Sequence, residues 1–164
     1  MNTAAETQLE AVSNLHQLQQ MLTFALGSEN YGVDIQRVQE IRGWSAVTPI
    51  PESPAHILGV LNLRGMIVPI IDLRIRLGMP DVGNGATTVI IVLSVVTTQG
   101  ARLFGIVVDR VSDVANISEA QLQPIPAVGN HSSARYLRGL AQLHDLMVLL
   151  LDIDALLSDS DSMF

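Results

Sequence analysis

The sequence carries one pattern of residues twice, and this internal repeat constrains the fold more than any other feature. Residues 31–41, YGVDIQRVQEI, align with residues 104–114, FGIVVDRVSDV, with the aromatic, glycine, arginine, valine and acidic positions in register. Residues 59–73, GVLNLRGMIVPIIDL, align in the same way with residues 139–153, GLAQLHDLMVLLLDI. Because the two pairs occur in the same order, the chain is expected to consist of two related halves.

Each half reads as a set of short strands. Leu22, Phe24 and Leu26 alternate with smaller residues, which is the period of a half-buried strand, and a glycine turn follows. The β-branched runs 89–93 and 103–108 predict a hairpin buried in a core. This spacing of short strands and turns predicts an all-β fold of two small closed barrels. Halves of this size bury too little surface to be stable alone, so they should share a hydrophobic interface, with a groove between them.

The repeat also sets the expected domain boundaries. Residues 1–20 are expected to form a flexible or helical N-terminal arm, and residues 21–157 a single domain of two barrels. The approximate halves are 21–80 and 86–157, although duplicated barrels can exchange strands. Residues 158–164 are expected to form a tail that follows a short C-terminal helix.

Composition and charge exclude several function classes. The formal charge of −7 and pI near 4.8 argue against nucleic-acid binding, which needs a basic surface. All nine basic residues are arginines, so lysine chemistry is excluded, and the absence of cysteine excludes thiol catalysis and disulfides. We find no signal peptide, and the apolar runs are far shorter than the roughly 18 residues of a spanning helix. The sequence therefore predicts a soluble cytoplasmic protein that does not insert into the membrane.

The sequence contains no convincing catalytic or metal-binding arrangement. The four histidines lack metal-ligand spacing, and Asp154 is expected to cap the C-terminal helix. We therefore expect no enzyme activity, no cofactor and no metal. Polar residues do interrupt apolar segments at Glu40, Arg42 and Arg64. Such an arginine either bridges a loop to a carboxylate or presents a planar fork to a partner protein, and the two roles are compatible.

At this point an ordered series of motifs resembles a known family. The motifs are LTFALG (22–27), YGVD (31–34), VQEIRG (38–43), GVLNLRG (59–65), VPIIDLR (68–74) and GIVVD (105–109) followed by VSDV (111–114). From about Met21 to Leu157 the chain is similar to the CheW family of bacterial chemotaxis coupling proteins. The resemblance implies two SH3-like five-stranded β-barrels that share a hydrophobic core. It also implies an adaptor that joins the cytoplasmic tip of methyl-accepting chemotaxis receptors to the regulatory domain of the histidine kinase CheA, in membrane-bound arrays where CheW-like domains can pair in rings.

Matching the motifs position by position implies roles for individual residues. The receptor-binding groove would contain Ile35, Val38, Glu40, Arg64, Gly105 and Val111. The alternative is that Ile35, Val38 and Val111 only fill the core. Gln123 and Val128 fall where family members meet the kinase or a neighbouring barrel, although this chain lacks the basic and aromatic residues of other members there. Gly59 and Gly65 are expected to allow tight turns or a close backbone approach.

Two other functions stay open at this level. An adaptor of a chemotaxis-like pathway controlling pili or development would share every motif. A small-ligand-binding β-barrel module is suggested only by the apolar groove expected between the barrels.

Overall fold

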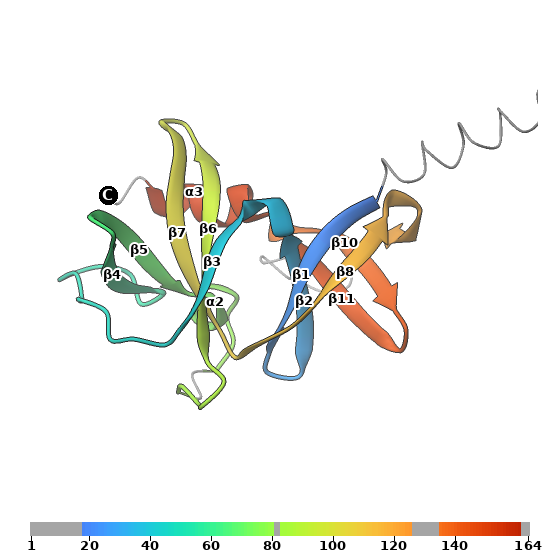
Figure 1. Ribbon diagram of the computed structural model, residues 1–164, viewed down its shortest axis with the longest axis horizontal. Coiled ribbons are helices and arrows are strands. Elements are labelled where there is room, and N and C mark those ends of the chain that lie inside the picture. Colours follow the sequence, from blue (N-terminus) through green and yellow to red (C-terminus); the bar gives the residue numbers. More distant parts are fainter. Residues whose placement is uncertain (1–17, 81–82, 126–134, 162–164) are drawn as a thin grey trace, which may run out of the picture.

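The computed structural model describes residues 18–80, 83–125 and 135–161, and their strands form two sheets that lie side by side (Figure 1). The five-stranded sheet has the order β3-β6-β7-β5-β4, and the six-stranded sheet has the order β8-β1-β2-β11-β10-β9. The strands are β1 (Leu18–Leu26), β2 (Glu29–Asp34), β3 (Val38–Gly43), β4 (Ile57–Leu63), β5 (Met66–Asp72), β6 (Val89–Thr97), β7 (Gly100–Val108), β8 (Arg110–Ser118), β9 (Leu122–Gln123), β10 (Leu137–Leu143) and β11 (Leu146–Leu151). The helices are η1 (Ile35–Arg37), α2 (Leu73–Arg76), η2 (Glu119–Gln121) and α3 (Ile153–Asp161).

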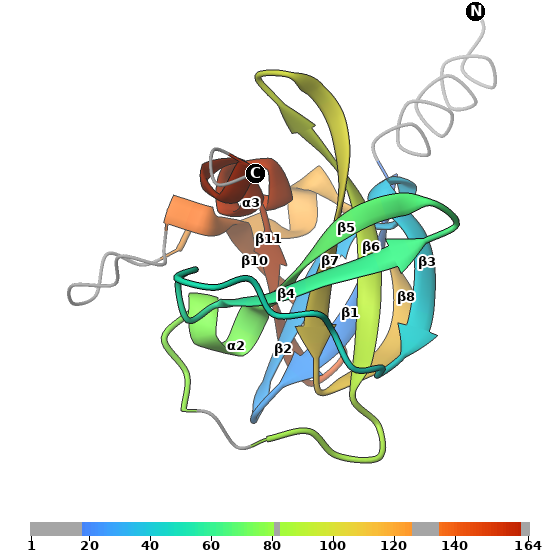
Figure 2. The same cartoon turned by 90° about the vertical axis from the view of Figure 1, so that its left-hand side faces the viewer.

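The predicted fold class, two SH3-like barrels with a few short helices, is confirmed. The sixth strand of the larger sheet is β9, which has only two residues. Viewed from the side of β4 and β5, α2 and α3 lie on the same side of the sheets (Figure 2). The expected hairpin over 89–108 is present as β6 and β7, which pair antiparallel along their full length.

The repeat reappears as two matching hairpins. The β4–β5 hairpin and the β10–β11 hairpin each contain a shift in register, just before Gly59 in one and just before Gly139 in the other. Gly59 has φ of +148°, and a Cβ there would lie 2.1 Å from the carbonyl oxygen of Thr48. The backbone therefore passes too close at this bulge for any residue except glycine.

Strands are exchanged between the sequence halves. β2 pairs in parallel with β11, and β5 pairs in parallel with β7, so each sheet takes strands from both copies of the repeat. The two exchanges are equivalent, because Gly32 lies opposite Leu150 in one and Gly105 lies opposite Ile70 in the other. A Cβ would come within 2.9 Å of the Leu150 side chain at Gly32 and within 2.6 Å of the Ile70 side chain at Gly105. Neither sheet is therefore a contiguous half such as 21–80 or 86–157.

A shared core joins the two barrels. Phe24, Tyr31 and Leu22 from one sheet pack with Phe104 and Leu93 from the other in the largest hydrophobic cluster. Smaller clusters fill the interior of each barrel. Because burial of aliphatic and aromatic surface is the main stabilising term, the two barrels are expected to unfold as one unit.

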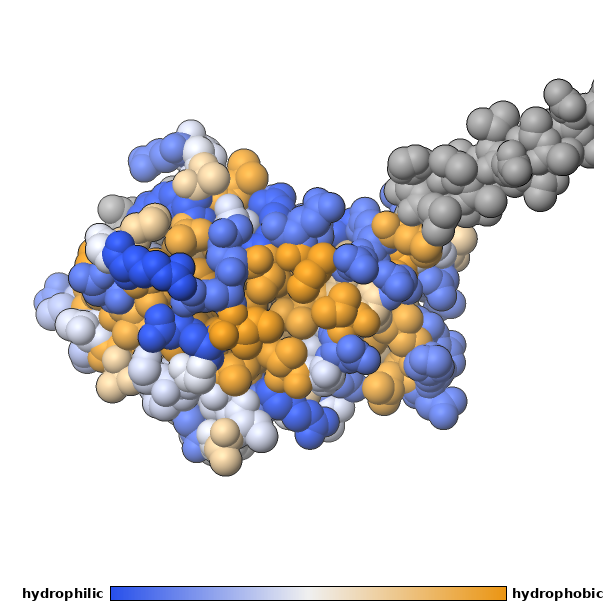
Figure 3. Space-filling model, viewed as in Figure 1, coloured by the Kyte–Doolittle hydropathy of each residue, from blue (hydrophilic) through white to orange (hydrophobic). Residues whose placement is uncertain are grey.

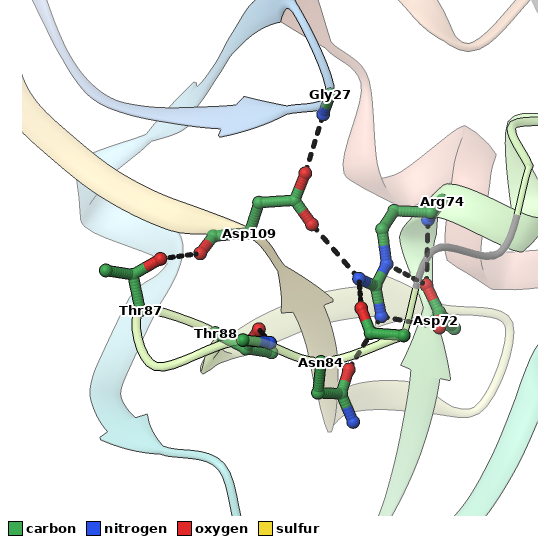
Figure 4. Close-up of polar contacts among 9 residues, drawn as sticks. Gly27, Asp72, Arg74, Asn84, Thr87, Thr88 and Asp109 are labelled. Carbon is green, nitrogen blue, oxygen red and sulfur yellow. Dashed lines mark hydrogen bonds and ion pairs between the residues drawn. The ribbon is translucent and has the colours of Figure 1, made fainter.

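Buried Arg74, which is 3% exposed, ties the two barrels together near the connection from β7 to β8 (Figure 4). Its guanidinium donates to both carboxylate oxygens of Asp72 at 3.0 Å and to Oδ1 of Asp109 at 3.0 Å. Oδ2 of Asp109 accepts from the backbone N–H of Gly27, in the β1–β2 turn of the other sheet. The hydrogen bonds that Arg74 donates to Asp72 are the main reason that the pKa of Arg74 is raised, while burial acts in the opposite direction.

The connection from β2 to β3 carries another ion pair, which joins η1 to α3. Arg37 of η1 forms a bidentate ion pair with Asp154 of α3, in which Nη1 donates to Oδ1 at 3.1 Å and Nη2 donates to Oδ2 at 2.8 Å. The sequence predicted that Asp154 caps α3, and this prediction is wrong. The cap is Asp152, whose Oδ1 accepts from the N–H of Ala155, because the helix begins at Ile153.

Two expected boundaries also differ from the structure. β1 begins at Leu18, inside the expected arm of residues 1–20, because Leu18, Gln19 and Gln20 pair with β8 despite their polar composition. α3 continues to Asp161, inside the expected tail of residues 158–164. Residues 1–17 and 162–164 lie outside the described residues.

Candidate interaction site

Apolar side chains gather on one face of the molecule where β3 and β8 come together (Figure 3). Ile35, Val38 and Val111 are all partly buried and all pack against the edge of the shared core. Ile41 on β3 and Val114 on β8, which are equivalent in the repeat, add exposed apolar surface at 44% and 45%. The three predicted residues therefore serve the core and also remain open to contact by a partner.

A charged cluster adjoins this apolar surface on β3. Glu40 accepts from Arg64 at 2.8 Å through one carboxylate oxygen and lies 3.5 Å from Arg42 through the other. The Glu40 side chain is 24% exposed, whereas the Arg64 side chain is 88% exposed. Arg64 therefore plays the first role left open by the sequence, since it bridges to a carboxylate, and its side chain still lies largely in solvent. Contact of Arg64 with a partner protein stays a prediction.

Local backbone geometry positions both charged residues. Asp34 accepts from the N–H of Gln36 and so caps η1, which turns the chain into β3 and places Glu40 on the inner face of its strand. Arg64 has φ of +53° in the β4–β5 turn, where the N–H of Gly65 donates to Oδ1 of Asn62 at 2.8 Å. Gly65 itself has φ of +87°, in the region that favours glycine.

Gly105 is not at this surface. It is buried in β7, opposite Ile70 and Val92, and its missing side chain makes room for Ile70 and Ile90. The structure therefore separates Gly105 from the exposed groove residues and gives it a packing role inside the barrel. The sequence could not separate these two roles, because a glycine that admits a partner and a glycine that admits a core side chain look the same in one chain.

The second predicted site lies elsewhere on the molecule. Gln123 is exposed on β9, at the opposite edge of the six-stranded sheet from β8. Only Leu122 and Gln123 of β9 pair with β10, so this edge is short. Val128 lies outside the described residues.

The arrangement is suited to recognition of a partner. Within residues 18–80, 83–125 and 135–161 we find no group of three or more His, Asp or Glu residues placed to hold a metal ion. The same part of the chain contains no helix long and apolar enough to cross a membrane. What the site offers is apolar surface beside a carboxylate and two guanidinium groups.

Sequence reasoning missed one further feature. On the six-stranded sheet, Asp113 and His144 face an open pocket at positions that the repeat makes equivalent to Glu40 and Arg64. The repeat carried the signal, because a position-by-position comparison of the two copies pairs these residues.

The chain was compared with known proteins. The model of the family described as a CheW-like domain matches residues 20–161. The chain is 47% identical over 143 residues to the protein "Chemotaxis protein CheW" of Klebsiella aerogenes. The aligned segment covers 87% of this chain and 84% of that one. The chain is 38% identical over 153 residues to "Probable chemotaxis protein CheW" of Rhizobium etli, which covers 93% and 96%.

Solved structures agree with this result. The crystal structure of the scaffolding protein TtCheW from Thermoanaerobacter tengcongensis superposes with a TM-score of 0.76 at 33% identity, covering 84% of this chain and 91% of that one. The two exchanged barrels, the apolar surface between β3 and β8, and a family match over nearly all described residues lead to the same assignment. This chain belongs to the CheW family.

Proposed function

We propose that this protein is a non-catalytic chemotaxis adaptor that couples methyl-accepting receptors to a CheA-type histidine kinase. The support is family membership together with a surface built for contact. The observation that carries the proposal is the apolar edge of the shared core next to Glu40 and Arg64. This surface suits the helical tip of a receptor, which would bring apolar side chains at helical spacing.

The kinase regulatory domain would bind at a different surface. Gln123 on β9 is the candidate, since an exposed edge strand can accept another β-rich domain. Contact at two surfaces would raise the effective concentration of the kinase at the receptor tip and would carry the protein to the membrane without inserting it. Receptor and kinase states would influence each other only if the adaptor contacts differ between those states.

The test combines binding and activity. The purified chain is mixed with a receptor cytoplasmic fragment and a kinase regulatory domain in pull-down assays, and kinase autophosphorylation is measured with and without the chain. We expect binding to both, and receptor-dependent control of the kinase only when the chain is present. Binding to neither would refute the coupling role.

Variants locate the receptor surface. Arg64→Ala should weaken receptor coupling while it changes the free energy of unfolding by less than about 1 kcal/mol, because the Arg64 side chain is 88% exposed and water screens its pair with Glu40. Arg138→Ala is the matched control, an exposed arginine on β10 that donates to Gln19. If Arg64→Ala and Arg138→Ala weaken receptor binding equally, Arg64 has no special role.

Exchanging the charges of Glu40 and Arg64 distinguishes the role of the ion pair from the role of each individual charge. In the double variant Glu40→Arg/Arg64→Glu the ion pair can form again in reverse. If the double variant regains the receptor binding that Arg64→Ala loses, the ion pair acts by positioning the apolar surface beside β3. Failure to recover, with an unchanged melting temperature, would mean that the receptor reads the charge of Arg64 itself.

A further inference from the structure

The two barrels differ at one pair of positions that the repeat makes equivalent, and the repeat allows a direct comparison. In the five-stranded barrel, Glu40 on the inner face of β3 is flanked by Arg42 and Arg64. The repeat pairs these residues with Asp113, Ala115 and His144, in that order, in the six-stranded barrel. The local geometry is preserved, since Arg64 has φ of +53° and His144 has φ of +54° in matching turns.

The second barrel therefore keeps the carboxylate but lacks both arginines. A pocket of about 440 Å³ lies at this place, between β8 and the β10–β11 turn, which are both on the right of Figure 1. Asp113, Ala115 and His144 all line it. Its apolar lining includes Val114, Leu143, Leu146 and Val148.

The carboxylate of Asp113 is held in a fixed position. Oδ1 accepts from the N–H of Val114 at 2.7 Å. Thr23 fixes the backbone of the same residue, because its hydroxyl donates to the carbonyl of Asp113 at 2.9 Å and accepts from its N–H at 3.1 Å. In the part of the chain that the structure describes, we find no ion pair at Asp113, so Oδ2 can still accept a charged donor.

We propose that this pocket binds the side chain of an arginine from a partner protein. The five-stranded barrel is the internal template, because there the equivalent carboxylate accepts from a guanidinium at 2.8 Å. The aliphatic stem of an arginine would pack on Leu143 and Leu146, and its planar fork would reach Asp113. The net charge of −7 favours the approach of a basic group. The pocket adjoins the proposed receptor surface, since Val114 belongs to both, but the test below uses neither receptor nor kinase and does not depend on their coupling.

The probe is Nα-acetyl-arginine N-methylamide, which mimics an arginine within a protein chain. It is titrated into the full chain while backbone amide shifts are followed by NMR. We expect saturable shifts confined to residues 112–116 and 143–148. The citrulline analogue, which keeps the shape of arginine but has no charge, should give no such shifts.

Two variants test the role of the carboxylate. Asp113→Asn retains an oxygen that can accept from the N–H of Val114, so the fold should survive, and it should weaken binding of the probe by about fivefold. Asp145→Asn is the matched control, since it removes an exposed carboxylate from the adjoining turn and should leave binding unchanged. Ala115→Arg/His144→Arg introduces the two arginines of the five-stranded barrel at the equivalent positions and should abolish binding of the probe.

Several results would overturn the proposal. Equal shifts with the citrulline analogue would mean that the pocket does not recognise a guanidinium. Equal loss with Asp113→Asn and Asp145→Asn would mean that the probe responds only to net charge. Free arginine binding at least as tightly as the capped probe would argue for a small molecule as the ligand, against an arginine borne by a protein.

Discussion

Removing the side chain of Arg74 should destabilise the fold far more than removing that of Arg64, although both are arginines. Arg74 and its partner Asp72 have side chains 3% and 5% exposed. All five N–H groups of the Arg74 guanidinium have acceptors, since it also donates to the carbonyl of Gly83 and to Oδ1 of Asn84. Arg74→Ala would leave the carboxylate of Asp72 buried without its counter-charge.

The expected loss follows from that burial. Breaking a buried ion pair by removing one partner costs about 4 kcal/mol of unfolding free energy. For a domain of this size, about 3 °C of melting temperature corresponds to each kcal/mol, which gives a fall of about 12 °C. Arg64→Ala should lower the melting temperature by no more than about 3 °C, because its pair with Glu40 is solvent-screened.

Urea unfolding followed by circular dichroism, together with thermal melts, measures both variants at pH 7.5. Asp72→Asn in the Arg74→Ala background should recover part of the loss, because a neutral amide is cheaper to bury than an unpaired carboxylate. Equal melting temperatures for the Arg74→Ala and Arg64→Ala variants would refute the reasoning. The reasoning would also be refuted if adding Asp72→Asn to Arg74→Ala recovered none of the lost stability.

Three further predictions concern stability and are measured by urea unfolding. Gly59→Ala should cost more than about 4 kcal/mol, since the new Cβ would meet the carbonyl oxygen of Thr48 at 2.1 Å, and a native-like midpoint would contradict this. Gly105→Ala should cost about 1–3 kcal/mol, because the new Cβ would meet side-chain atoms of Ile70 and Ile90 and no backbone atom closer than 3.8 Å, and a loss as large as that of Gly59→Ala would argue against it. Burial, and then the charge of Arg76, lowers the pKa of His56 below its usual 6.5. The folded state then binds fewer protons, so stability should be lost as the pH falls below 6.5, and His56→Gln should remove that part of the pH dependence; identical pH profiles for the two proteins would count against it.

Much of the fold could be predicted from local patterns. The β6–β7 hairpin and the turn glycines Gly59 and Gly65 leave a signal within a few residues of the sequence, and the duplication is visible when residues 31–41 are aligned with 104–114. Glu40, Arg42 and Arg64 were also singled out, because polar residues inside apolar segments are conspicuous, but only the structure shows that Arg64 pairs with Glu40. The helix cap was misplaced by two residues, because two aspartates stand close together at the start of the helical segment: Asp152 caps the helix, whereas Asp154 lies within it and pairs with Arg37.

Other features could not be read from local patterns. Gly105 fits a partner site and a crowded core equally well as a sequence position, and only its contact with Ile70 decides between them. The buried network around Arg74 joins residues from Gly27 to Asp109, and such spacing has no period that a sequence window can detect. The open pocket at Asp113 required knowing that the two turns adopt the same backbone geometry.

Two copies of one strand-rich unit can be recognised in the order of amino acids alone, because the alternation of side chains and the turn glycines are properties of short segments. The tertiary structure decided which strands pair. The parallel pair of β2 with β11 joins segments more than a hundred residues apart. Backbone hydrogen bonds alone do not select this partner, since any strand offers the same N–H and C=O groups. The choice is made by side-chain fit, as where Leu150 fills the space beside Gly32, and by the shared core that only the exchanged arrangement builds.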